Sequence, residues 1–139
     1  MGKVDDPDVS AIESMNKQTE AAYIADDWMR FMDFFTDDAI WMPPNEAPLI
    51  GKEAMWSWAK QWWDESTIEE MTVSYEEIVV AGDWAFERHN RTTVTVPKAG
   101  GESSTSHDKG IWLLRRQADG SWKIARYIWN TNPSPGADT

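Results

Sequence analysis

The chain of 139 residues contains no cysteine. This absence excludes a disulfide framework, a thiol nucleophile and any metal site with cysteine ligands. Long hydrophobic runs are also lacking. No stretch reaches the roughly 18 apolar residues of a membrane-spanning helix, and the N-terminal residues lack the apolar segment of a secretory signal peptide. From these absences we expect a cytoplasmic protein with no membrane partner.

Basic residues are scarce, with 13 Lys and Arg against 24 Asp and Glu and a formal net charge of −11. A field of this sign repels the phosphate backbone of nucleic acids and the anionic surface of membranes. We therefore expect no nucleic acid among the partners of this protein.

Several catalytic motifs are missing as well. The sequence has no glycine-rich phosphate-binding loop, no G-x-S-x-G nucleophile elbow and no H-E-x-x-H zinc motif. Glu87 and His89, with His107 as a distant third ligand, suggest the beginning of a metal site. Glu-x-His is a weak pattern, however, and solvent-exposed or interfacial histidines are the alternative that we favour. We expect neither a metal nor a cofactor.

Ten tryptophans are the outstanding feature of the composition. Each carries a large apolar ring and one N–H that needs a partner, so a chain rich in tryptophan often encloses a wide aromatic cavity or forms an interface. A tryptophan-rich packed core is the alternative, and the composition does not decide between the two.

The order of hydrophobic patterns predicts helices followed by an antiparallel meander. We expect helices over residues 8–26, 27–35 and 51–65, and strands over 37–42, 71–81, 84–96 and on both sides of a turn within 103–132. A single domain over 1–139, with disordered ends at about 1–7 and 133–139, accommodates these elements. The predicted fold class is α+β, with a curved antiparallel sheet wrapped around the N-terminal helices.

The last two strands are predicted to form a hairpin at Asp119-Gly120, a dipeptide suited to a two-residue loop. In that register Leu114 pairs with Ala125, Trp112 with Tyr127, and Gly110 with Trp129. Cross-strand partners share a face, so Asp108 joins Trp112, Tyr127 and Trp129 on one face. Both faces are substantially apolar, which predicts a pocket on one side and a packing partner on the other.

On the strand over 84–96, side chains alternate between two faces. We assign Trp84, Phe86, Arg88, Asn90 and Thr92 to the pocket face. The opposite face then carries Ala85, Glu87, His89 and Arg91.

A polar set on the pocket face marks the candidate site. A buried arginine needs an anion, and Asp108 is the nearest candidate for Arg88. We predict Asp108 as the general acid or base, with Arg88 and Tyr127 orienting the substrate or stabilising charge. The alternative is an ion pair that only joins two strands. The substrate-binding candidates are Asn16, Thr19, Tyr23, Trp41, Trp58, Phe86, Asn90, Trp112 and Trp129.

Three segments carry a family resemblance: residues 22–59, with their Asp-Asp-Ala, Pro-Pro and Gly-Lys-Glu groups, VVAGDWAFER at 79–88, and LRRQADGSWKIARYIWN at 114–130. Together they resemble the nuclear-transport-factor-2-like superfamily, and within it the small SnoaL-like and ketosteroid-isomerase-like proteins. The resemblance spans about residues 10–133. It implies a cone-shaped α+β barrel with a deep apolar pocket, and a homodimer formed through the outer face of the sheet.

The resemblance carries few catalytic residues with it. The base, the oxyanion-hole tyrosine and the neutral aspartic acid of ketosteroid isomerases fall at Pro43, Thr19 and Trp112, so none is matched. Limonene epoxide hydrolases, also similar in fold, use an Asp-Arg-Asp set. Arg88 matches its arginine, while Asn90 and Trp129 stand at the two aspartate positions. The family therefore implies a pocket but neither of these two mechanisms.

We expect a cofactor-independent enzyme that acts on a small hydrophobic molecule by isomerase, cyclase, dehydratase or hydrolase chemistry. One alternative is a non-catalytic carrier that binds a ligand in the same pocket. Another is a dimeric assembly module whose tryptophans fill the cavity. The sequence identifies neither a substrate nor a reaction.

Overall fold

The computed structural model describes residues 6–133. The elements are α1 (Pro7–Ile24), α2 (Trp28–Asp33), β1 (Phe35–Met42), β2 (Leu49–Ile50), α3 (Lys52–Glu65), β3 (Ser66–Ala81), β4 (Trp84–Pro97), β5 (Ser104–Arg116) and β6 (Trp122–Thr131). The strands form a six-stranded sheet in the order β2-β1-β6-β5-β4-β3. Neighbouring strands are antiparallel except β1 and β6, which run parallel.

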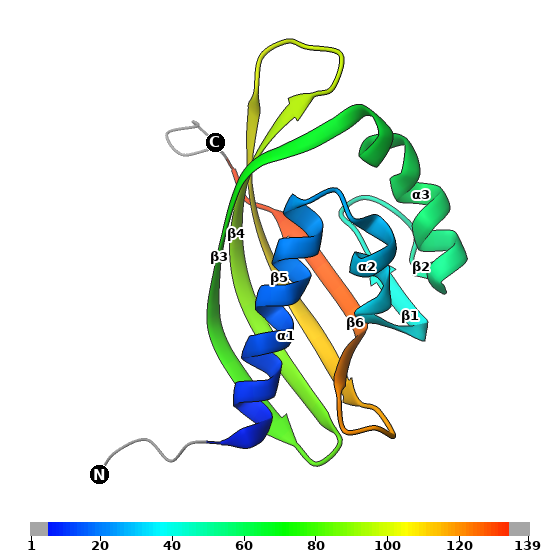
Figure 1. Cartoon of the computed structure of the whole chain (residues 1–139), viewed down its shortest axis with the longest axis vertical. Helices are drawn as coiled ribbons and strands as arrows, with labels where there is room; N and C mark the ends of the chain where they lie inside the picture. The colour runs from blue at the N-terminus through cyan, green and yellow to red at the C-terminus, as the bar shows by residue number, and fades with distance from the viewer. Residues whose placement is uncertain (1–5, 134–139) are drawn as a thin grey trace.

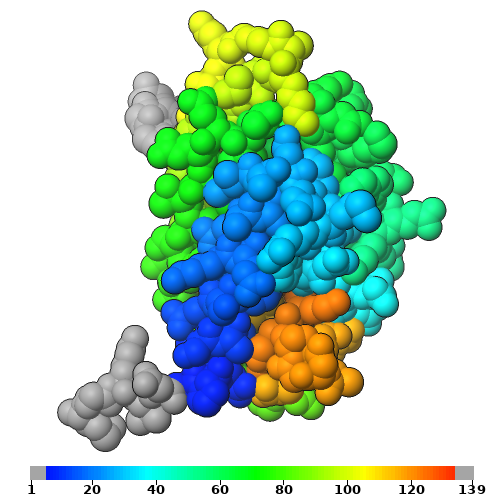
Figure 2. Space-filling view, in the orientation of Figure 1, coloured from blue at the N-terminus to red at the C-terminus, as the bar shows by residue number. Residues whose placement is uncertain are grey.

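The sheet curves around the helices, which lie on its concave side (Figure 1). Two irregularities in the pairing of β3 with β4, one between Ile68 and Glu70 and one between Tyr75 and Glu77, accompany this curvature. In the space-filling view α1 and α2 cover the middle of the concave face (Figure 2). The interior of the protein therefore lies between the sheet and the helices.

Asp6 caps the N-terminus of α1, and its carboxylate accepts a hydrogen bond from the backbone N–H of Asp8 at 2.9 Å. Pro7 occupies the first turn, where the absence of its N–H has no cost. The buried stripe of the helix comprises Ile12, Met15, Asn16, Thr19 and Ala22. Its helical spacing brings two polar side chains into the interior together with the apolar ones.

Arg116, at the end of β5, fastens the start of α1 to the sheet. Its guanidinium donates to both carboxylate oxygens of Asp8, at 2.7 and 2.9 Å, and to Asp83 at 3.2 Å. It also lies 4.5 Å from the ring centre of Trp122. A bidentate arginine–carboxylate contact fixes orientation as well as distance, so this contact sets where α1 crosses the sheet.

The connection between β5 and β6 is longer than predicted. Arg116 pairs with Trp122, so residues 117–121 form the loop in place of a two-residue turn. A bulge then follows: Leu114 pairs with Ile124 and not with Ala125. Beyond the bulge the pairs of Trp112 with Tyr127 and of Gly110 with Trp129 are as predicted. The longer loop and the bulge compensate each other, because each shifts the register.

The bulge changes which side chains are buried only at the end of the hairpin next to the loop. Trp122 and Ile124, which simple alternation places on the outer face, are 3% and 0% exposed and belong to the core. Tyr127 is also buried, as the predicted pairing requires. A bulge of this kind lets one strand change the face it buries along its length.

Strand β4 turns inward the face opposite to the predicted one. Arg88 lies on the outer face, where its Nε donates to Glu77 at 3.0 Å with half of the arginine side chain exposed. Asn90 donates to Glu76 at 3.2 Å on the same outer face. The prediction relied on the large rings of Trp84 and Phe86, which the sheet leaves on its outer side at 44% exposure for Trp84.

The inner face of β4 carries Glu87 and His89, which are 0% and 2% exposed. Pairing with β5 fixes this orientation. His89 lies opposite Gly110 and Arg91 opposite Asp108, and both of these β5 residues belong to the inner face of the sheet. A Cβ atom at position 110 would lie 3.1 Å from His89 Nε2 and 2.9 Å from the carbonyl oxygen of Ile128. Only glycine leaves room for the imidazole here.

The α+β prediction is confirmed, although β2 and β3 remain edges and the sheet does not close into a barrel. The predicted disorder falls mainly on residues 1–5 and 134–139, which lie outside the described range, whereas Asp6 caps α1 and Pro7 begins it. Within the range described, none of the helices has the length and apolar character needed to cross a membrane.

Candidate functional site

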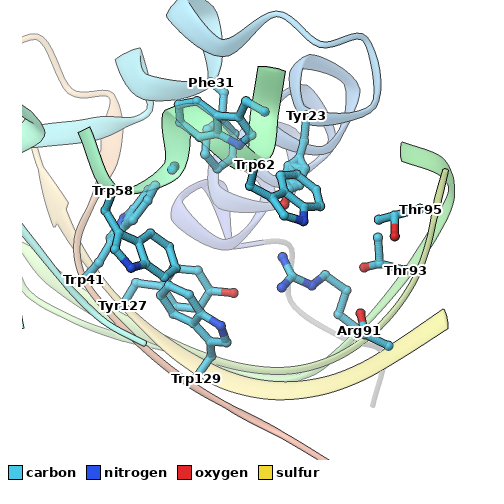
Figure 3. Close-up of a pocket in the computed structure, with 13 residues that line it drawn as sticks. Tyr23, Phe31, Trp41, Trp58, Trp62, Arg91, Thr93, Thr95, Tyr127 and Trp129 are labelled. Carbon is cyan, nitrogen blue, oxygen red and sulfur yellow. The ribbon is translucent and has the colours of Figure 1, made fainter. Parts of the chain in front are cut away.

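A cavity of about 280 Å³ lies between the concave face of the sheet and α3 (Figure 3). Its lining is mostly aromatic and comprises Tyr23, Phe31, Trp41, Trp58, Ala59, Trp62, Trp63, Arg91, Thr93, Thr95, Ser106, Tyr127 and Trp129. Small-molecule sites typically span roughly 300–1,000 Å³. The volume therefore suits a compact ligand of one or two rings.

Packing among the rings fixes the aromatic wall. Trp129 of β6 meets Trp41 of β1 and Trp58 of α3 edge to face, each at 6.1 Å between ring centres. Trp58 and Trp62 of α3 are 41% and 38% exposed, so they stand where the cavity meets solvent. Edge-to-face contacts restrain the orientation of each ring, and the wall therefore exists before any ligand arrives.

Arg91 is the charged group of the cavity. Its Nη2 donates to Asp108 Oδ2 at 3.0 Å, and 18% of the arginine side chain and 9% of the aspartate side chain are exposed. Burial opposes the arginine charge, but the Asp108 carboxylate supports it by its own charge and by its hydrogen bond, and the pKa of Arg91 lies above its ordinary value. The guanidinium is therefore charged, and it points into the cavity (Figure 3).

Two tyrosine hydroxyls share the space with that guanidinium (Figure 3). The Tyr127 hydroxyl has no hydrogen-bond partner among residues 6–133. Burial raises the pKa of Tyr127 and of Tyr23, and Arg91 offsets part of that increase. Both phenols therefore stay neutral and can donate hydrogen bonds. A guanidinium and a neutral phenol that converge in an apolar cavity can stabilise negative charge on a ligand oxygen.

A smaller inner chamber of about 30 Å³ shares Tyr23, Phe31, Arg91 and Tyr127 with the cavity. Its remaining lining is Thr19, Glu20, Met71, Val73, Tyr75, His89 and Trp112. Burial, and to a smaller extent the charge of Arg91, lower the pKa of His89 to about 4. Its imidazole is thus neutral near pH 7. The Nδ1 atom has no hydrogen-bond partner in the described part of the chain.

A buried acid and amide pair, Glu87 of β4 and Asn16 of α1, joins the sheet to the helix. Asn16 Nδ2 donates to Glu87 Oε1. The other oxygen of each group, Glu87 Oε2 and Asn16 Oδ1, is buried and finds no partner within residues 6–133. Burial raises the pKa of Glu87 to about 8, against the opposing effect of the Asn16 hydrogen bond. Glu87 therefore holds its proton near pH 7.

The structure separates the predicted site residues into groups. Tyr23, Trp41, Trp58, Tyr127 and Trp129 line the cavity, and Thr19 and Trp112 line the inner chamber. Asp108 is buried and paired with Arg91, outside the lining of the cavity. Asn16 binds Glu87. The prediction assigned Arg88 and Asn90 to the wrong face of β4. It assigned Phe86 wrongly as well, because Phe86 pairs with Val79, which is exposed on the outer face.

Sequence reasoning missed Arg91 as a group of the cavity and His89 as a group of the inner chamber. Alternation along β4 places both side chains on the same face, and the prediction turned that face outward. One signal in the sequence favours the inward orientation, because Gly110 can accept a bulky neighbour on the inner face of β5. The pairing of Arg91 with Asp108, which satisfies the buried carboxylate directly, is visible only in the structure.

No group of three His, Asp or Glu side chains within residues 6–133 is arranged to hold a metal ion. His107, the third ligand of the metal site suggested by the sequence, has its Nδ1 3.1 Å from the hydroxyl oxygen of Thr92. The expectation of no metal and no cofactor stays a prediction.

A family model described as "SnoaL-like domain" matches residues 17–127. Among solved structures, the chain is similar to a ketosteroid isomerase-like protein from Erwinia carotovora atroseptica, with 25% identity and a TM-score of 0.81 over 93% of this chain and 100% of that one. It is also similar to a conserved protein from Planctomyces limnophilus, with 24% identity and a TM-score of 0.81 over 90% and 98% of the two chains.

A third similar structure is a putative aromatic ring hydroxylase from Novosphingobium aromaticivorans, with 20% identity and a TM-score of 0.76 over 94% of this chain and 93% of that one. The second and third likenesses show the fold alone. A comparison with curated proteins yields no match.

Proposed function

The chain belongs to the SnoaL-like domain family, and on that premise we propose that it is a cofactor-independent enzyme acting on a small hydrophobic carbonyl compound. The proposed chemistry is proton transfer at the carbon next to the carbonyl. Arg91 and Tyr127 stabilise the negative charge that develops on the carbonyl oxygen, and Asp108 holds Arg91 in position. One observation carries the proposal: the Arg91 guanidinium and the Tyr127 hydroxyl, which has no hydrogen-bond partner within residues 6–133, converge inside a tryptophan-walled cavity (Figure 3).

The charge balance of the site favours a neutral ligand. Asp108 already compensates the charge of Arg91, so a ligand that arrives as an anion adds an uncompensated charge to a buried site. A neutral ketone adds none, and acquires charge only as its proton leaves. Donors that meet charge in the transition state accelerate the reaction more than donors that bind the ground state. The name of one similar structure, a ketosteroid isomerase-like protein, also refers to a ring compound.

Exchange of carbon-bound hydrogen tests this function without knowledge of the natural product. We expect the protein to accelerate exchange of the α-hydrogens of 2-tetralone, an enolisable bicyclic ketone, in D₂O, followed by NMR. Tyr127→Phe should slow the exchange about 100-fold, since loss of one such donor costs roughly that factor. Arg91→Lys should also slow it, because lysine lacks the planar fork of N–H groups.

The matched control is Arg88→Lys, on the opposite face of the same strand, which should exchange like the wild type. Tryptophan fluorescence of the same samples reports ketone binding. Binding without exchange would favour a carrier, and equal rates for wild type and Tyr127→Phe would contradict the charge-stabilising role.

The outer face of the sheet supports a proposal of homodimerisation. Its exposed apolar side chains are Val79, Trp84, Ile111, Leu113 and Ile128, each 39–44% exposed. They extend over β3, β4, β5 and β6, on the face away from the helices. Apolar side chains that gather on one exposed face in this way are typical of a protein–protein interface. The cytoplasmic location expected from the sequence stays a prediction.

Charge substitution at this face should separate the subunits. We expect the wild type to sediment as a dimer and the Leu113→Lys/Ile128→Lys double variant as a monomer, because burying two ammonium groups disfavours association. Ile50→Lys, at an apolar residue that is 71% exposed on β2, is the matched control and should leave the dimer intact. A monomeric wild type at micromolar concentration would exclude this interface.

A further inference from the structure

The inner chamber has the size and the polar groups of a site for a single water molecule. A volume of about 30 Å³ exceeds the roughly 10–15 Å³ that one buried water needs. Four buried atoms of the lining residues have no hydrogen-bond partner in the described range: His89 Nδ1, Arg91 Nε, Trp112 Nε1 and the Tyr127 hydroxyl oxygen. A buried water commonly satisfies two to four such atoms.

We propose that His89, acting through a water in this chamber, accepts the proton that the substrate loses, a role that rests on the function proposed above. The chamber adjoins the cavity at Arg91 and Tyr127, the two groups assigned to the substrate oxygen. A water there therefore lies between the reacting end of the ligand and the imidazole. His89 positions and deprotonates this water and need not touch the ligand itself.

The other titratable groups around the chamber are already committed. Tyr75 donates its hydroxyl proton to Glu20 at 2.9 Å. Arg91 is charged and accepts no proton. Tyr127 and Tyr23 are neutral phenols, which donate more readily than they accept. Glu87, on the same face of β4, binds Asn16.

His89 is therefore the neutral nitrogen base among these groups. Its ring is held between Trp112 and Tyr127, at 5.1 and 5.8 Å between ring centres. Tyr75 lies at 6.2 Å on a third side. Such packing restrains the imidazole, which suits a group that must keep one nitrogen directed at a water.

The proposed step balances without a further reactant. The carbon next to the carbonyl releases a proton to the water while the electron pair of the C–H bond moves into the enolate. The water passes one of its own protons to His89 Nδ1, and Arg91 and Tyr127 donate hydrogen bonds to the enolate oxygen. The reverse transfer returns a proton to carbon, at the same position for exchange or at a conjugated position for isomerisation.

The test uses the 2-tetralone exchange assay with His89→Gln, which keeps the size and hydrogen bonding of the side chain but not its basicity. We expect exchange to fall at least 100-fold, while quenching of tryptophan fluorescence by 2-tetralone stays within twofold of the wild type. In the wild type the rate should rise as the pH increases through about 4 and then stay level. That step should be absent from the profile of His89→Gln.

A second variant guards against a structural explanation. In His89→Ala the imidazole volume is vacant, and added free imidazole should restore exchange, which a merely structural role does not predict. His107→Gln is the control, because that histidine lies outside both chambers. Equal exchange by wild type and His89→Gln overturns the role of His89 alone. A wild type that binds 2-tetralone and does not exchange it overturns the proposed function itself.

Discussion

Replacing Asp108 with alanine is expected to lower the free energy of unfolding by about 3–5 kcal/mol, the usual cost of leaving one member of a buried ion pair alone. Arg91 keeps its charge in an interior where 18% of its side chain is exposed. The change removes its carboxylate partner at 3.0 Å and supplies no substitute. Urea denaturation followed by tryptophan fluorescence measures the loss.

Two further variants show whether the pair itself stabilises the fold. Arg91→Met/Asp108→Leu should recover most of the loss, because an apolar pair of similar size often replaces a buried ion pair without cost. It should nevertheless abolish 2-tetralone exchange. Glu77→Ala breaks the exposed pair with Arg88 on the outer face and should cost no more than about 1 kcal/mol. A loss below about 1 kcal/mol for Asp108→Ala would show that the pair is not effectively buried.

The second large effect concerns pH: we expect the protein to lose stability as the pH rises from about 6.5 to about 8. Burial raises the pKa of Glu87 from 4.5 to about 8. Between those values the folded chain holds a proton that the unfolded chain has released, so stability falls with increasing pH. The expected slope is about 1.4 kcal/mol per pH unit.

His89 acts in the opposite direction at lower pH. Its pKa falls from 6.5 to about 4 on burial. Between those values the unfolded chain binds the extra proton, and stability rises with pH. The two groups oppose each other from about 4.5 to 6.5. Above that range the Glu87 contribution acts alone, with a total loss of about 2 kcal/mol by pH 8.

Glu87→Gln should remove this loss. Glutamine can accept from Asn16 Nδ2 and donate to Asn16 Oδ1, which satisfies both atoms left without partners. Denaturation at pH 6.5 and 8 should therefore give equal stabilities for Glu87→Gln and different ones for the wild type. Glu77→Gln, at an exposed glutamate of β3, should keep the wild-type difference. A wild type equally stable at both pH values would show that Glu87 is ionised throughout.

Local patterns in the sequence predicted most of the elements and part of the site. Helical spacing from Ile12 to Ala22 predicted α1, and the order of elements predicted the α+β class, since both depend on neighbours along the chain. The pairing of Trp112 with Tyr127 was also predicted and is confirmed. This pairing is correct although the predicted turn is wrong, because the bulge in β6 compensates the register shift of the longer loop.

The assignment of Arg88 to the interior failed for a different reason. Alternation along β4 defines two sets of side chains but not which set faces inward. Trp84 and Phe86 suggested one answer, since large rings are usually buried. The sheet as folded has apolar groups on both faces, so hydrophobicity could not choose between them.

The sequence by itself determined the acidic surface, the absence of thiol chemistry, the abundance of tryptophan and the succession of helices and strands. The tertiary structure alone decided that Arg91 and His89, and not Arg88 and Asn90, point into the interior. The reason is that the phase of β4 is set by its neighbour: Gly110 of β5 leaves room for His89, and Asp108 pairs with Arg91. Contacts between neighbouring strands determine which face of β4 turns inward, and periodicity within one strand does not.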